Sequence, residues 1–206
     1  MNKVYVVGVH HQIRKMYLEE GWEITTSPYD ADYVHLGGTT LIDPTFYGNA
    51  KRNPLDITNP VLDAYELNTF HSLKHEVSFV GTGRGAWILG VALFRDLGIT
   101  EYSSNLVHQT FYYNNDDDGF EEGDWLVNPS VHLRFREKGK MAYSSTKPLV
   151  YPLDIWEEPI ISVHLGTMDA RKRHLLYTPF PELDDKESNT RRMFFKYVEE
   201  EILNGL

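Results

Sequence analysis

Residues 77–93 read Val-Ser-Phe-Val-Gly-Thr-Gly-Arg-Gly-Ala-Trp-Ile-Leu-Gly-Val-Ala-Leu, and this stretch decides the fold. A run of β-branched and aromatic residues, a Gly-x-Gly-x-Gly turn and a nearly all-apolar segment predict a buried strand that turns sharply into a buried helix. This is the architecture of a nucleophile elbow, in which the residue at the tip projects over the ends of the sheet. The residue at the tip is Gly83, which has no side chain to react.

Composition and charge exclude several classes of protein. The 206 residues suffice for one well-covered core, and we expect a single domain over residues 1–206. The formal charge of −10 argues against a nucleic-acid partner. No apolar run approaches the roughly 20 residues that a membrane helix needs. A strand predicted at the very N-terminus leaves no signal peptide before it, so we expect a cytoplasmic protein.

The chain contains no cysteine. This absence excludes disulfides, thiolate metal sites and a cysteine nucleophile together. No motif in the sequence indicates a cofactor, and we expect none.

Strands alternate with helices through the first hundred residues, which indicates parallel βαβ units. Asn59 and Pro60 predict the start of one of these helices, as its cap and its first residue. The expected elements are strands over residues 3–8, 22–26, 31–36 and 77–82, and helices over residues 13–20, 60–73 and from 84 to about 97.

The second half is less periodic. It predicts short strands over residues 105–113, 126–136, 141–152, 159–164 and 173–177, with an acidic loop over residues 114–124. Asn189 or Thr190 is expected to cap the last helix. The fold class that follows is α/β: a three-layer, open, mostly parallel sheet with helices on both faces and a small antiparallel extension.

Motifs of the first hundred residues resemble one known family. The chain contains, in order, Gly37-Gly38, Asp43-Pro44 before Tyr47-Gly48, Asp63 with Glu66, and the elbow. These motifs are similar to those of the gamma-glutamyl hydrolase and gamma-glutamyl-GABA hydrolase branch of the class I glutamine amidotransferase fold. That branch shows a Gly-Gly turn, Asp-Pro-x-x-Tyr-Gly, an Asp-x-x-Glu helix and a Gly-x-Cys-Arg-Gly-x-Gln elbow. The resemblance implies a flavodoxin-like sheet.

The resemblance places the family's Cys-His-Glu triad on Gly83, His164 and Gly166. The histidine is assigned because residues 160–166 stand where the family has Gln-x-His-Pro-Glu, of which this chain keeps only the histidine. The family's chemistry needs a thiolate to attack the gamma-carboxamide and a Glu to orient the imidazole. We therefore expect no glutaminase or hydrolase activity by this route.

The resemblance also implies an anion-binding site that needs no side chain. In the family, backbone amides of the Gly-Gly turn and of the residue after the nucleophile form the oxyanion hole, here Gly38 and Arg84. Such donors at a helix N-terminus can bind a carboxylate. His132 lies in a segment similar to the family's Val-Asn-Ser-x-His-His-Gln. His10 and His11 follow the first strand, where open α/β sheets bind their ligands, so all three are candidate ligand-binding residues.

Several hydroxyl and imidazole groups allow a functional or a structural interpretation. Thr82 or Thr39 would be a substitute nucleophile, but we favour a turn-closing hydrogen bond. The imidazoles that could converge in a metal or acid/base cluster are those of His10, His11, His35 and His164. No fixed ligand spacing supports such a cluster, and we expect no metal.

Four further motifs are also open to two interpretations. Residues 114–119 begin like a calcium loop, but Trp125 stands at the twelfth position, so we favour a solvated acidic loop. Arg171-Lys172-Arg173 would hold a phosphate, or form a solvated strand edge. Asp63 and Glu66 share a helix face, and we interpret them as structural. Trp87 is expected to fill part of the family's pocket.

The function that we expect is that of a catalytically inactive relative of this family. It would act as a ligand-binding or regulatory subunit for a small carboxylate or gamma-glutamyl ligand, beside an amide-forming ligase or synthetase. One alternative is an amidohydrolase or glutamine amidotransferase that acts on a gamma-glutamyl amide through His164, His10 and His11. Another is a structural or host-interaction protein on the same scaffold. Nothing in the sequence bears on its oligomeric state.

Overall fold

The computed structural model describes most of the first hundred residues and the C-terminal segment. Described in full are residues 1–40, 42–47, 58–94, 172–177 and 179–204, apart from the side chains of Pro44, Tyr47 and Phe94. Of strands 97–99, 107–112, 123–127, 133–135, 144–145, 151–152 and 163–169 only the backbone is described. Residues 114–122 of the expected acidic loop, with the start of the calcium-like motif, lie outside the described residues. So does His132.

The main sheet has seven strands in the order β2-β1-β3-β4-β12-β11-β9. The first five run parallel to one another, and β11 and β9 continue the sheet in antiparallel pairing. This arrangement confirms the predicted mostly parallel α/β sheet with an antiparallel extension. The strands are β1 (Lys3–Val6), β2 (Glu23–Ile24), β3 (Tyr33–Leu36), β4 (Ser78–Thr82), β9 (Ser144–Ser145), β11 (Val163–Asp169) and β12 (Lys172–Tyr177).

β12 is the neighbour of the elbow strand, although it comes from the far end of the chain. It pairs with β4 so that Leu175 lies opposite Val80 and Tyr177 opposite Thr82. The predicted strand over 173–177 is thus confirmed. The end of the strand predicted over 159–164 falls on β11, which begins at Val163. β11 pairs with the other side of β12, with His164 opposite Leu176, and is therefore one strand further from β4. The last four residues of β12 are buried, in agreement with its place next to β4.

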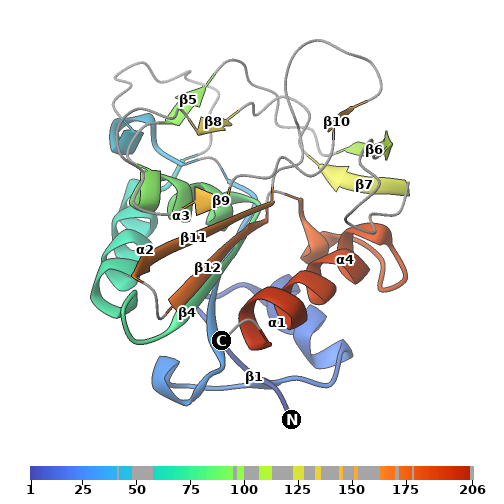
Figure 1. Ribbon diagram of the computed structural model, residues 1–206, viewed down its shortest axis with the longest axis horizontal. Helices are drawn as coiled ribbons and strands as arrows, with labels where there is room; N and C mark the ends of the chain where they lie inside the picture. Colours follow the sequence, from blue (N-terminus) through green and yellow to red (C-terminus); the bar gives the residue numbers. More distant parts are fainter. Residues whose placement is uncertain are drawn as a thin grey trace.

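Helices cover both faces of this sheet (Figure 1). One face carries α1 and α4, and the other carries α2 and α3. No helix of the described residues is both long and apolar enough to cross a bilayer. The helices are α1 (His11–Glu19), α2 (Pro60–Leu73), α3 (Arg84–Phe94) and α4 (Asn189–Tyr197), and a π-helical turn continues α4 over Val198–Leu203.

Alternation along the central strands supplies one core on each face. Val80 and Leu175 point to the face of α1 and α4, where Tyr17 and Phe194 are fully buried. Their neighbours Phe79 and Leu176 point to the face of α2 and α3 and pack with residues such as Phe70. The central strands β3, β4 and the end of β12 are therefore buried on both faces, as expected for parallel strands.

The remaining described elements are short. A three-stranded sheet has the order β10-β6-β7, and β5 pairs with β8. These strands are β5 (Leu97–Ile99), β6 (Val107–Tyr112), β7 (Gly123–Val127), β8 (Leu133–Phe135) and β10 (Tyr151–Pro152), and the 3-10 turns are η1 (Pro28–Asp30), η2 (Pro44–Tyr47) and η3 (Pro181–Leu183).

Helix caps test the sequence analysis residue by residue. Asn59 caps α2 as predicted, because its Oδ1 accepts a hydrogen bond of 3.1 Å from the Leu62 amide. The predicted cap of α4 is wrong by one residue. Ser188 is the cap, and its Oγ accepts from the Arg191 amide at 3.2 Å. Asn189 is already helical and its Oδ1 accepts from the Arg192 guanidinium.

The cap assignment predicts two different stabilities. Ser188→Ala removes an acceptor from a backbone amide and should lower the free energy of unfolding by about 1 kcal/mol. Asn189→Ala removes only an exposed side-chain hydrogen bond and should change it by less than about 0.5 kcal/mol. Urea unfolding of both variants measures the difference, and equal losses would contradict the assignment.

Candidate functional site

The elbow joins the carboxyl end of β4 to the start of α3. Gly83 stands between them with φ +47°, and its carbonyl already accepts from the Ala86 amide at 3.1 Å. A Cβ at Gly85 would collide with the carbonyl of Leu36, so α3 starts in close contact with the end of β3. The predicted strand–turn–helix elbow is present, and its glycines are required by this close approach.

Phe180 occupies the space in front of the elbow tip. A Cβ built on Gly83 would lie 2.6 Å from the Phe180 Cδ1 atom and 3.0 Å from the Gly38 carbonyl oxygen, and it would overlap Cε1 of the same ring. Phe180 follows β12 by three residues and is 5% exposed. The elbow tip therefore accepts no side chain while Phe180 is in place.

Gly38 and Arg84 meet, but not as a pair of free donors. The Arg84 amide donates to the Gly38 carbonyl oxygen at 3.0 Å. The predicted oxyanion site thus has its second donor engaged by the main chain of the Gly-Gly turn. A carboxylate would have to displace this hydrogen bond before it could bind the amide.

The Arg84 side chain turns into the protein instead of toward a ligand. Its guanidinium is buried between two carboxylates of α2, donating to Asp63 Oδ1 and, at 2.6 Å, to Glu66 Oε2. It also donates to the Gly37 carbonyl oxygen at 3.4 Å. The structural interpretation of Asp63 and Glu66 is confirmed, since both hold the first residue of α3.

His10 lies at the edge of this network. Its Nε2 is 3.8 Å from Glu66 Oε1, beyond hydrogen-bond distance, and neither atom has a hydrogen-bond partner among the described residues. His11 is the first residue of α1 and is exposed. The structure therefore places His10, but not His11, beside the buried carboxylates.

A chain of hydrogen bonds crosses the core beneath the elbow. The Tyr33 hydroxyl donates to the Tyr17 hydroxyl, which lies 2.6 Å from His35 Nδ1. His35 Nε2 lies 2.9 Å from Thr82 Oγ1. The two ring nitrogens of His35 thus join the Tyr17 hydroxyl to the Thr82 hydroxyl.

Thr82 is fully buried, and its hydroxyl contacts His35 beneath the elbow instead of projecting at the tip. Burial lowers the pKa of His35 to about 3, with a smaller contribution from nearby His10, so the ring is neutral near pH 7. Thr82 forms a hydrogen bond with His35 on β3, which differs from the expected turn-closing hydrogen bond. Thr39 is exposed.

Glu182 is the most perturbed carboxyl group of the site. It follows Phe180 in η3, is 6% exposed, and neither of its oxygens accepts a hydrogen bond of good geometry from the described residues. Burial raises its pKa from 4.5 to about 7. Its own backbone amide and the Thr82 hydroxyl oppose this shift, as do the more distant His10 and Arg191.

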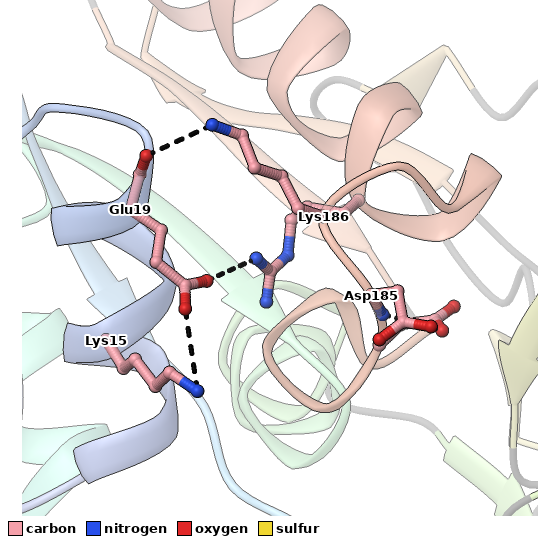
Figure 2. A pocket seen from close by; sticks show the side chains of 6 residues that line it. Lys15, Glu19, Asp185 and Lys186 are labelled. Carbon is pink, nitrogen blue, oxygen red and sulfur yellow. Dashed lines mark hydrogen bonds and ion pairs between the residues drawn. The ribbon is translucent and has the colours of Figure 1, made fainter.

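A hollow of about 360 Å³ lies where α1 meets the segment 184–191 (Figure 2). Its charged groups largely neutralise one another. Glu19 accepts from Arg191 at 2.7 Å and pairs with Lys15 at 3.5 Å, and the Lys186 ammonium donates to the Glu19 carbonyl at 3.2 Å. The Arg191 hydrogen bond lowers the pKa of Glu19. The ion pairs around this hollow join α1 to the segment 184–191, and no elbow residue lines it.

The other candidate residues are dispersed. His164 and Gly166 lie on β11, which is separated from β4 by β12, whereas the described ring beside Gly83 is that of Phe180. Trp87 packs in the core between the sheet and α2 instead of filling a pocket. Arg173 pairs with Glu201 at 3.1 Å. Among the described residues, no three potential ligands form a metal site.

The fold recurs in solved structures. A glutamine amidotransferase from Thermotoga maritima is similar to 100% of this chain and 86% of its own, with a TM-score of 0.55 and 10% identity. A protein from Thermoplasma acidophilum that is assigned as a GMP synthase subunit has a TM-score of 0.55, and the match covers 97% of this chain and 95% of that protein, with 12% identity. PurLQS from Thermotoga maritima gives 0.57 over 97% of both chains, with 13% identity. No family model and no curated protein sequence matches the chain.

These similarities show the glutamine amidotransferase-like fold. One further likeness to the resembling family was not used in the sequence-based predictions. Phe180-Pro181-Glu182 follows a buried strand and differs from the His-Pro-Glu of the resembling family at its first residue only. The Pro-Glu pair begins four residues after the Leu-Leu-Tyr of β12 and was visible in the sequence.

The contact between Gly83 and Phe180 predicts a coupled pair of substitutions. Gly83→Ala should lower the free energy of unfolding by about 2–3 kcal/mol, because a Cβ meets both a positive φ and the Phe180 ring. In a Phe180→Ala background the same substitution should cost at least about 1 kcal/mol less. Denaturant unfolding of the four proteins gives the coupling energy, and simple additivity would contradict the contact.

Glu182 predicts a pH dependence of stability. Because its pKa is higher in the folded state than its usual 4.5, its contribution is favourable below pH 4.5 and is lost as the pH rises to about 7. Glu182→Gln should therefore become the more stable protein at alkaline pH, by at most about 3 kcal/mol.

Thermal or urea unfolding of both proteins between pH 5 and pH 8 tests this prediction. The opposite, acid-side contribution of His35 is common to both proteins and cancels in their difference. A difference that does not grow with pH would contradict it.

Proposed function

We propose that this chain is a glutamine amidotransferase-like protein without glutaminase or gamma-glutamyl hydrolase chemistry, which acts in the cytoplasm as a ligand-binding or regulatory subunit. The observation that carries the proposal is the packing of Phe180 on Gly83. An active elbow needs both a nucleophile at its tip and space for the acyl group in front of it. Here the tip has no side chain, and an aromatic ring fills the space.

We infer further that Phe180 and Glu182 occupy the positions of the family's histidine and glutamate. Three observations support this assignment over the one to His164 and Gly166. β12 runs parallel to β4 and ends at the same edge of the sheet. Phe180 contacts the elbow tip. Glu182 is a buried carboxyl group two residues later. One member of the triad is thus retained, without an imidazole to orient.

The finer parts of this proposal concern ligand and partner. The motif order of the first hundred residues favours the gamma-glutamyl hydrolase branch, and with it a small carboxylate or gamma-glutamyl ligand. Such a ligand requires the Gly38 carbonyl to release the Arg84 amide. The partner that we propose is an amide-forming ligase or synthetase. This chain, which has no glutaminase chemistry of its own, would regulate that partner.

A second candidate function is an amidohydrolase or glutamine amidotransferase with a histidine-based mechanism. The position of His10 favours it, since Nε2 and Glu66 Oε1 face each other at 3.8 Å with no other hydrogen-bond partner in the described residues. A pH–rate profile that depends on a histidine and disappears in His10→Ala would support this candidate over the first.

The proposed function predicts that the unmodified protein has no turnover, and the triad assignment predicts that a cysteine introduced at position 83 has a lowered thiol pKa. Purified protein should release no ammonia or glutamate from glutamine or gamma-glutamyl amides above the level without protein. In Gly83→Cys/Phe180→His, the new thiol faces an imidazole backed by Glu182, which should lower its pKa by at least about 1 unit. Iodoacetamide labelling between pH 5 and pH 9 measures that pKa.

Two matched variants serve as controls for the thiol experiment. Gly83→Cys/Phe180→Ala has the same space but no imidazole and should titrate near the ordinary cysteine value. Adding Glu182→Gln to the double variant should return its thiol toward that value. Glutaminase turnover in the unmodified protein would refute the proposed function, and identical thiol pKa values in all variants would refute the triad assignment.

A further inference from the structure

The segment 179–183 forms a compact turn that covers the elbow tip. The Leu183 amide donates to the Phe180 carbonyl at 3.1 Å, which makes η3 a unit of its own. The Phe180 ring lies on Gly83, and Glu182 is buried on the inner side of the same turn. Movement of this one turn would therefore uncover the tip and expose the carboxyl group together.

Two hydrogen bonds, from the Gly83 amide and from Arg191 Nε, attach the turn to the rest of the protein. The Gly83 amide donates both to the Pro179 carbonyl and to the Tyr177 carbonyl, each at 3.1 Å, and the second belongs to β12. Arg191 Nε donates to the Pro181 carbonyl at 3.1 Å, while its Nη1 is held by Glu19. If the turn lifts, the Gly83 amide keeps the Tyr177 carbonyl as its acceptor. Arg191 keeps Glu19 through Nη1, while its Nε loses the Pro181 carbonyl, so opening breaks one side-chain hydrogen bond and leaves no backbone amide unsatisfied.

Ionisation of the buried Glu182 carboxyl group would destabilise the closed position of the turn. The groups that act on it are its own backbone amide, Thr82 at the end of β4, His10 after β1, Tyr17 of α1 and Arg191 of α4. Neither carboxylate oxygen is properly hydrogen-bonded within the described residues. A buried ionised carboxylate in such a place is costly, and exposure to water removes the cost.

We propose that residues 179–183 are a lid that is closed when Glu182 is protonated and opens when Glu182 ionises, thereby clearing the elbow tip. This regulation of the site rests on the proposed function for its purpose, because a cleared tip is the space a ligand would enter. The shift of the Glu182 pKa to about 7 places the transition near neutral pH.

The experiment follows the Gly83–Phe180 contact by nuclear magnetic resonance. In the closed state the Gly83 α-protons lie against the Phe180 ring, which gives a nuclear Overhauser effect and a ring-current shift. Both signals should be present at about pH 5 and lost by about pH 9. In Glu182→Gln, which stays neutral, both should persist over the whole range.

The matched control is Glu187→Gln, which removes the same charge from an exposed residue nearby and should behave like the unmodified protein. Persistence of the contact at about pH 9 in the unmodified protein would overturn the proposal. So would its loss in Glu182→Gln, or the simultaneous loss of contacts between β1 and β3, which would indicate global unfolding. The measurement needs neither ligand nor activity, so its failure is distinct from that of the proposed function.

Discussion

The elbow depends on one buried ionic interaction, that of Arg84 with Asp63 and Glu66. Arg84 is the first residue of α3, and its guanidinium holds α2 and the Gly37 carbonyl at the end of β3. Asp63 also accepts from the Asp43 amide at 2.8 Å, which attaches the loop after the Gly-Gly turn. Removing one partner from such a buried group leaves an uncompensated charge and costs about 3–5 kcal/mol in other proteins. The Gly-Gly turn, α2 and the elbow therefore have one fixed arrangement.

The parts of the fold that local signals specify could be predicted from the sequence. The elbow, the alternation of strands and helices, and the Asn59 cap follow from residues within one or two turns of each other. The place of β12 could not be predicted in the same way. Its pairing with β4 joins Phe79 to His174, which are 95 residues apart, and no local pattern encodes which of several apolar strands lies there.

The candidate site shows the same division. Gly83 at the tip and the structural roles of Asp63 and Glu66 were found because each lies in a recognisable spacing. Phe180 was missed because its effect is exerted across space on a glycine, and an aromatic residue after a strand is ordinary. The hydrogen bonds among Tyr17, Tyr33 and His35 were missed for the same reason, since buried hydroxyl partners leave no periodic signal.

The order β3-β4-β12 also decides when the protein can finish folding. β4 is complete at residue 82, but its second partner ends at residue 177 of a 206-residue chain. During synthesis, the hydrogen-bonding edge of β4 that faces β12 waits for nearly a hundred residues to be added. An open central edge invites pairing with other chains, and pairings of such high sequence separation form slowly. The same late strand that brings Phe180 to the elbow thus leaves this edge of the nascent chain open to incorrect pairing until late in synthesis.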